Sequence, residues 1–218
     1  MSSRTLSFSV LMTVYNPAHD VEEILPTFLE QEYEPGYEVI VVDESSTDET
    51  PDVLKLLKSR YQHLYTTFLP KPNRQVVRRK QAFNIGVKAA KNEWIIITKI
   101  HNHPIAANLL QTISEQCDER LPLTLGYHQK KGIRLQSFSD LDEMRQYIRR
   151  QERRGASIKE RNHGNYIWGR YDFIILKKEY AYDLLNLFEQ SISGSELFGI
   201  RLGILCKNLW QRSSTVLI

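Results

Sequence analysis

The sequence predicts an α/β fold, in which a mostly parallel sheet is covered by helices on both faces. Short apolar segments alternate with segments whose apolar residues recur at helical spacing, as in successive strand–helix units. Tyr37 to Val42 is a near-continuous β-branched run, typical of a parallel strand buried on both faces. Right-handed crossovers between such strands give a doubly wound layer.

The first strand is expected from residue 6 to residue 14, and a helix follows from residue 20 to residue 31. The helix spaces its apolar residues three and four positions apart, so that they form one buried face. These residues are Val21, Ile24, Leu25, Phe28 and Leu29.

The second strand, 37–42, is followed by a helix that runs through Lys58. Thr47 or Asp48 can cap this helix, and Pro51 suits its first turn because proline needs no hydrogen-bond partner there. A third strand is expected at 64–69, and a proline-containing loop follows it.

A helix from about residue 75 to residue 90 begins with basic residues, and Trp94 to Thr98 forms the fourth strand. The second half has a less regular pattern, with Ser139 opening a charged helix that carries Asp142 three residues later. Its other expected elements are a helix from 105, strands at 121–125, 132–136 and 171–176, a polar surface loop at 155–164, and helices at 177–188 and 195–207.

Length and composition favour one domain, 1–218, with halves 1–104 and 105–218. A chain of 218 residues can bury a sizeable core without metal or disulfides, and the spacing of Cys117 and Cys206 suggests neither. The net charge of +3 gives no argument for nucleic acid, and no window resembles a membrane span. We therefore expect a soluble, cytoplasmic protein, or one peripheral at the inner face of the membrane.

Polar residues stand directly after the first two strands. Tyr15 and Asn16 follow the first, and Asp43 ends the second, before Glu44-Ser45-Ser46-Thr47-Asp48. In an open α/β sheet, ligands bind at the carboxyl ends of the strands. The pattern predicts a small-molecule site.

These motifs resemble the opening of the family 2 glycosyltransferases, which are inverting sugar transferases of GT-A fold. The resemblance extends, with decreasing clarity, from Ser9 to about Leu202. It implies a GT-A-like, Rossmann-like three-layer α/β/α domain with a mostly parallel central sheet. The first half would bind a UDP- or GDP-linked sugar, and the second half would face a glycan, lipid-linked or other hydroxyl acceptor.

The resemblance places Thr13, Tyr15, Asn16, Asp43 and Ser45 at the nucleotide sugar. Asp43 would accept hydrogen bonds from the base or ribose. The alternative is that this acid and its neighbours only form a turn and cap the next helix, and both roles are compatible.

A basic residue and an asparagine near the nucleotide are implied at Arg78-Arg79-Lys80 and Asn84. Lys80 and Asn84 are four positions apart on one helix face, which makes them the preferred pair. The alternative is a solvated basic face.

The D-x-D motif of the family is degenerate here, because Lys99 and His101 stand at the two acids that would bind Mg²⁺ or Mn²⁺. Three interpretations stay open. Lys99 or a protonated histidine supplies the positive charge directly; His101 and His103 bind a softer metal such as Zn²⁺; or the site is inactive. The metal requirement is thus unknown, and the usual acidic ligands are absent.

The second departure from the family concerns the catalytic base. An inverting transferase needs a carboxylate to deprotonate the acceptor, and the family's Glu-Asp pair falls on Gly194 and Ser195, so Glu196 serves only with a shift of one residue. Its alternative role is to stabilise the first turn of a helix. Asp172 is the other nearby acid, without a motif.

The sequence therefore indicates a glycosyltransferase-like protein, of the kind used in polysaccharide biosynthesis, that inverts the sugar and works without the usual metal site. The first alternative is an inactive GT-A-fold protein that binds a nucleotide sugar or partners a transferase. The second is an interaction domain whose basic 145–161 region contacts a membrane surface or an acidic protein.

Overall fold

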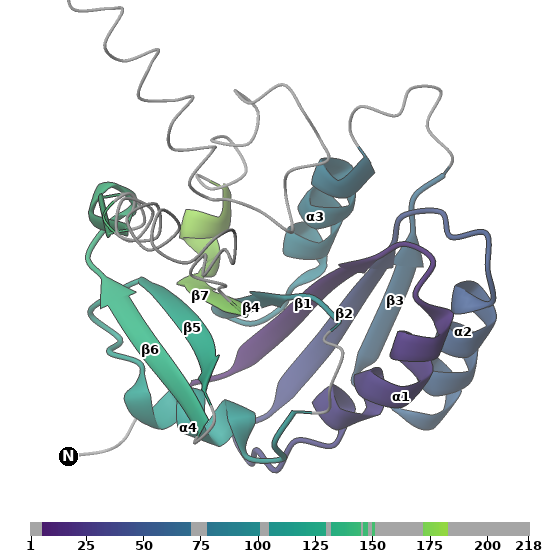
Figure 1. The fold of residues 1–218 in the computed structure, drawn as a ribbon, viewed down its shortest axis with the longest axis horizontal. Coiled ribbons are helices and arrows are strands. Elements are labelled where there is room, and N and C mark those ends of the chain that lie inside the picture. Colours follow the sequence, from purple (N-terminus) through teal and green to yellow (C-terminus); the bar gives the residue numbers. More distant parts are fainter. Residues whose placement is uncertain are drawn as a thin grey trace, which may run out of the picture.

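The computed structural model describes residues 6–70, 78–100, 105–129, 132–144, 146–147, 150 and 172–182. Strands and helices alternate through the first hundred residues, as the periodicity predicts (Figure 1). The elements in chain order are β1 (Phe8–Val14), α1 (Ala18–Leu29), β2 (Tyr37–Asp43), α2 (Thr50–Arg60), β3 (Leu64–Phe68), α3 (Arg78–Ala89), β4 (Trp94–Thr98), α4 (Leu109–Gln116), β5 (Leu123–Gln129), β6 (Gly132–Phe138) and β7 (Phe173–Lys177).

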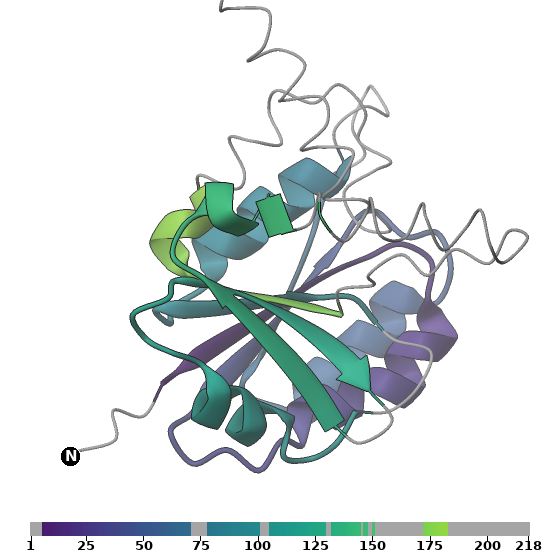
Figure 2. The ribbon, with the colours of Figure 1, turned by 60° about the vertical axis from the view of Figure 1, so that its left-hand side comes forward.

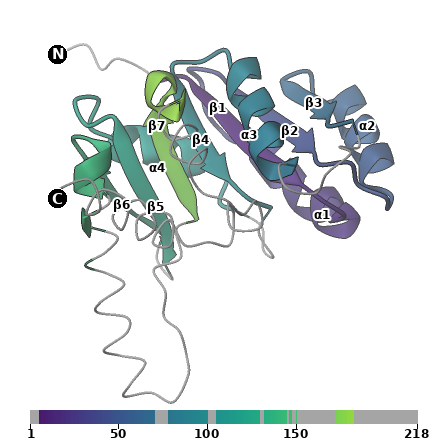
Figure 3. The ribbon, with the colours of Figure 1, turned by 90° about the horizontal axis from the view of Figure 1, so that it is seen from above.

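The described strands form one 7-stranded sheet in the order β3-β2-β1-β4-β7-β5-β6. Figure 3 shows this order across the molecule, from β6 on the left to β3 on the right. The four strands of the first half are mutually parallel, and β7 then pairs antiparallel with both β4 and β5. The expected α/β class with a mostly parallel centre is confirmed.

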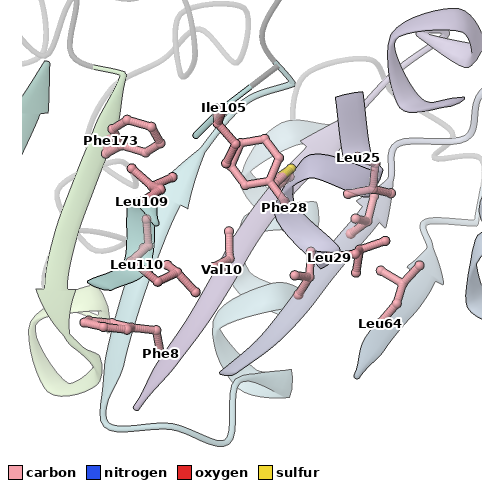
Figure 4. Packing of buried hydrophobic residues seen from close by; sticks show 14 of the residues in the cluster. Phe8, Val10, Leu25, Phe28, Leu29, Leu64, Ile105, Leu109, Leu110 and Phe173 are labelled. Carbon is pink, nitrogen blue, oxygen red and sulfur yellow. The ribbon is translucent and has the colours of Figure 1, made fainter. Parts of the chain in front are cut away.

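Two hydrophobic layers hold helices against the sheet. One packs α1, α2 and α4 on the face that carries Phe8 and Val10, and the other packs α3 on the face that carries Leu11. Figure 4 shows part of the first layer, where Phe28 of α1 and Ile105 lie over the sheet. Burying each such side chain stabilises the fold by about 1.5–3 kcal/mol.

The α3 layer depends on a close approach at Gly86. A Cβ atom at this position would lie 2.1 Å from Cδ1 of the buried Leu11, so a larger residue would have to displace the end of that side chain. The residue belongs to the segment that resembles the family, but its role is in packing.

The second half departs from the expected pattern in two places. The β5–β6 hairpin lies beside β7 (Figure 2), and β5 extends to Gln129, beyond the short strand that the sequence predicts. Asp142 is not the residue that pairs with Ser139. The carboxylate of Glu143 accepts the Ser139 N–H at 2.8 Å, and Oδ1 of Asp140 accepts the Glu143 N–H at 2.8 Å. One further residue separates the partners because Asp140 takes the capping position.

Several expected features lie outside the described residues. These are the loop at 155–164, the helix at 195–207 and most of the basic 145–161 region. Of the helix expected at 177–188, residues 178–182 are described, and they are helical.

Candidate functional site

The candidate site lies at the edge of the sheet where β1, β2, β3 and β4 end. Hydrogen bonds continue past the last strand residues: the Glu44 N–H donates to the Val14 carbonyl at 2.8 Å, and the Leu69 N–H donates to the Asp43 carbonyl at 2.8 Å. The first residues of the loops are therefore as firmly placed as the strands. Such a rigid edge suits ligand binding.

Three hydrogen bonds join the loop after β1 to the loop after β2. The Asn16 N–H donates to Oγ of Ser46 at 2.9 Å, and the Thr47 N–H donates to Oδ1 of Asn16 at 2.8 Å. Nδ2 of Asn16 donates to Oγ1 of Thr47 at 3.3 Å. The asparagine at the predicted position thus links the two loops with both its backbone and its amide side chain.

Two residues of these loops adopt a left-handed backbone, Asn16 with φ 55° and Ser45 with φ 67°. Asparagine tolerates this conformation, whereas serine is less suited to it. The Ser45 hydroxyl donates to the Leu69 carbonyl, which ties the second loop to the end of β3. Left-handed non-glycine residues concentrate at functional sites, where surrounding contacts maintain them.

Asp43 is nearly buried, with 5% of its surface exposed, and its Oδ1 accepts the Ser46 N–H at 2.9 Å. The turn role considered from the sequence is therefore present. A carboxylate can accept further hydrogen bonds, and within the described part of the chain Oδ2 accepts none. Turn formation and ligand binding are compatible at this residue.

Asp48 connects the starts of two helices. Its Oδ2 accepts the Ala18 N–H and its Oδ1 accepts the Thr50 N–H, both at 3.1 Å. Burial acts to raise the pKa of Asp48, but hydrogen bonds from Thr50 and Ala18 outweigh it, so the pKa lies below its usual value. Neither predicted capping residue, Thr47 or Asp48, is the N-cap of α2: this is Glu49, whose side chain makes no capping hydrogen bond, and Asp48 supports the helix from one residue earlier.

The remaining nucleotide residues surround this network. Thr13 is half-buried on β1, on the same side as Leu11, and Tyr15 is 47% exposed. Asn84 is half-buried on α3, while the side chain of Lys80 lies outside what the structure describes.

Lys99 follows the end of β4 and is exposed. Within the described residues it has no ion-pair partner, so its charge is available to a ligand. The buried Thr98 precedes it, and Oγ1 of Thr98 donates to the Asp172 carbonyl at 2.9 Å. No motif in the sequence singles out Asp172, but the antiparallel course of β7 brings it beside the degenerate D-x-D position.

Three predicted positions cannot be placed, because His101, His103 and Glu196 lie outside the described residues. The zinc interpretation and the Glu196 base thus stay predictions. In the described part of the chain, no group of three metal-ligating side chains exists. Burial raises the pKa of the Cys117 thiol to about 11, so it stays protonated at neutral pH.

The strand order and the course of the chain define a GT-A-like α/β domain. Residues 9–99 match the model of the glycosyl transferase family 2, which confirms the resemblance seen in the motifs: this segment is similar to the family 2 glycosyltransferases. The match includes both loops of the candidate site and ends at Lys99.

Two known proteins show the extent of the similarity. A Methanococcus voltae dolichyl N-acetyl-alpha-D-glucosaminyl phosphate 3-beta-D-2,3-diacetamido-2,3-dideoxy-beta-D-glucuronosyltransferase is 30% identical over 103 residues, which cover 44% of this chain and 29% of that protein. The mannosyltransferase PcManGT from Pyrobaculum calidifontis, solved with GDP-Man and Mn²⁺, superposes with a TM-score of 0.55 at 21% identity, over 83% of this chain and 47% of that one.

These similarities confirm the fold and the family resemblance. The chain spans less than half the length of either protein, so its activity and substrates are a matter for proposal. The described part of the chain contains no helix long and apolar enough to cross a membrane.

Proposed function

We propose that this chain transfers a sugar from a UDP- or GDP-linked donor to a glycan, lipid-linked or other hydroxyl acceptor, with inversion at the anomeric carbon. The observation that carries the proposal is the pair of linked loops after β1 and β2, inside the segment that matches the family. The loops hold Asp43 at the strand end with spare acceptor capacity for a base or ribose.

Lys99 supplies the positive charge at the leaving diphosphate in this proposal. The leaving group gains negative charge in the transition state, and a fixed cation at that point stabilises it. The exposed ammonium group of Lys99, unpaired within the described residues, suits this role. The family's metal is then not required.

The relatives from Methanococcus and Pyrobaculum are both named as transferases, which favours an active protein over an inactive binder. The Pyrobaculum protein binds GDP-Man, in line with a nucleotide-sugar donor here. A lipid-phosphate sugar in the name of the Methanococcus protein fits a lipid-linked acceptor. Such an acceptor would bring the protein to a membrane surface.

Thermal and urea unfolding with UDP, GDP, UDP-N-acetylglucosamine and GDP-mannose tests the proposal, each in EDTA, Mn²⁺ or Zn²⁺. A nucleotide at 100 times its Kd should raise the free energy of unfolding by about 2.7 kcal/mol. We expect one nucleotide to stabilise the protein in EDTA, and Lys99→Ala to reduce that effect.

Lys91→Ala is the matched control, because Lys91 is also exposed but follows α3 at the opposite edge of the sheet. It should leave nucleotide stabilisation unchanged. Stabilisation only with Mn²⁺ or Zn²⁺ would contradict the role of Lys99. Folded protein that responds to no nucleotide would contradict the transferase proposal and favour an interaction domain.

A further inference from the structure

The start of β7 lies against the end of β4, at the edge that carries the candidate site. The two strands pair antiparallel, and their last paired residues there are Thr98 and Phe173. The next residue outward is Lys99 on one strand and Asp172 on the other. A carboxylate and a cationic side chain that are far apart in the sequence therefore occupy neighbouring backbone positions at the degenerate D-x-D motif.

The backbone of Asp172 is fixed on two sides. Its carbonyl accepts the Thr98 hydroxyl at 2.9 Å, and its N–H donates to the Gly126 carbonyl on β5 at 2.9 Å. The residue is half-buried rather than displayed on an outer loop. A side chain supported by two strands keeps the positional precision that a catalytic group needs.

Asp172 also lies at the boundary between two parts of the sheet. On one side are the parallel strands whose ends form the candidate nucleotide site, and on the other is the β5–β6 hairpin. A displacement reaction needs its base at such a boundary, between the bound donor and an arriving acceptor.

We propose that Asp172 is the general base of the transfer reaction, an inference that rests on the proposed function. The Asp172 carboxylate takes the proton of the acceptor hydroxyl, whose oxygen forms a bond to the anomeric carbon of the donor. The bond from that carbon to the diphosphate oxygen breaks, and the nucleoside diphosphate leaves with the electron pair, beside the Lys99 ammonium group.

The test uses water as the acceptor, so that no acceptor needs to be identified. The full chain is incubated with UDP-N-acetylglucosamine or GDP-mannose, and release of UDP or GDP is measured beside the Kd of the nucleotide. Asp172→Asn should lower kcat about 10²- to 10⁴-fold, because the amide cannot accept the proton. The nucleotide Kd should stay within about twofold, since the base does not bind the nucleotide.

Asp118→Asn is the matched control. Asp118 is a half-buried acid that follows α4, and its carboxylate contacts Arg120 rather than the site. Its kcat should equal that of the unaltered chain. Formate provides a second readout: a small external carboxylate should restore part of the activity of Asp172→Ala, which it would not do for a purely structural residue.

Three results would overturn the assignment. Asp172→Asn could keep kcat within about threefold, it could lose nucleotide binding together with activity, or Glu196→Gln alone could reproduce the loss with rescue by formate. Failure of the proposed function gives a different result from failure of the Asp172 assignment. In that case the unaltered chain would neither bind a nucleotide nor release UDP or GDP from either sugar donor.

Discussion

Strand β2 carries a buried acid near each end, and the two acids differ in how many protein donors they satisfy. Glu38, near the start, is 9% exposed, and its Oε1 accepts the Ser9 hydroxyl at 2.7 Å and the Lys91 N–H at 2.6 Å. Asp43, at the end, is 5% exposed and accepts one N–H, from Ser46. Burial alone does not distinguish them.

The difference separates an acid that holds the fold from one that has capacity left for a ligand. The hydrogen bonds around Glu38 form a closed network. The Ser9 oxygen also accepts the Asn92 N–H at 3.2 Å, and the Asn92 side-chain amide donates to the Phe8 carbonyl at 2.7 Å. These contacts fix the turn between α3 and β4. Around Asp43 the bonds hold loops and leave one carboxylate oxygen without a donor from the described residues.

The largest effect is expected at the closed network. Glu38→Ala leaves the Ser9 hydroxyl and the Lys91 N–H without their acceptor in a buried place, and should lower the free energy of unfolding by about 3 kcal/mol. Urea unfolding measures this loss. Glu38→Gln, which keeps an acceptor oxygen, should lose less, and equal losses for the two variants would contradict the hydrogen-bond explanation.

The second prediction concerns the other acid. Asp43→Asn keeps the shape and an acceptor for the Ser46 N–H, so unfolding without ligand should change by less than about 1 kcal/mol. The nucleotide should lose about 2 kcal/mol of binding free energy, roughly thirtyfold in Kd, because hydrogen bonds to a charged acceptor are the stronger ones. Calorimetric titration with UDP and GDP measures this change in Kd. An unchanged Kd would show that Asp43, like Glu38, serves only to hold the fold.

A third variant tests the close packing of α3 on β1. Gly86→Ala forces a methyl group against Leu11, and overpacking of this kind should cost about 1.5 kcal/mol. The double variant Gly86→Ala with Leu11→Ala makes room for the methyl group. If its free energy of unfolding equals the sum of the single effects, the contact is not the cause.

The smallest expected effect lies at Asp48, where Asp48→Asn should cost about 1 kcal/mol or less because its hydrogen bonds with the Ala18 and Thr50 N–H groups are weakened. Because the pKa of Asp48 is lower in the folded chain than in the unfolded one, its contribution is present above about pH 4 and is lost as the pH falls through the folded value. Urea unfolding from pH 7 to pH 3 should show a shallower decline for the variant. Parallel curves would assign the decline to other acids.

The sequence predicts the first half well because each part of it is a local strand–helix unit. The bounds of the strand from Trp94 to Thr98 are predicted correctly, and the loops after β1 and β2 lie together as their positions at strand ends require. Periodicity and turn chemistry are short-range signals, and they suffice where neighbours in sequence are neighbours in space.

The rest depends on pairings that no local pattern encodes. The hydroxyl of Ser46, which no motif singles out, accepts the Asn16 N–H, whereas Ser45 has a left-handed backbone and donates its hydroxyl to the Leu69 carbonyl. Asp172 lies near Lys99 because β7 runs antiparallel to β4. The apolar residues of a strand do not predict whether it pairs parallel or antiparallel.

The place of β7 in the sheet also sets an order of assembly. Among the described strands, the β5–β6 hairpin contacts the rest of the sheet only through β7, although the hairpin is made earlier along the chain. Docking β7 on β4 closes a loop of 74 positions, as the Thr98–Asp172 bond spans, and that closure is slow compared with forming the local units. We therefore expect the parallel strands to fold first during synthesis. The β5–β6 hairpin joins the sheet only after β7 has been synthesised.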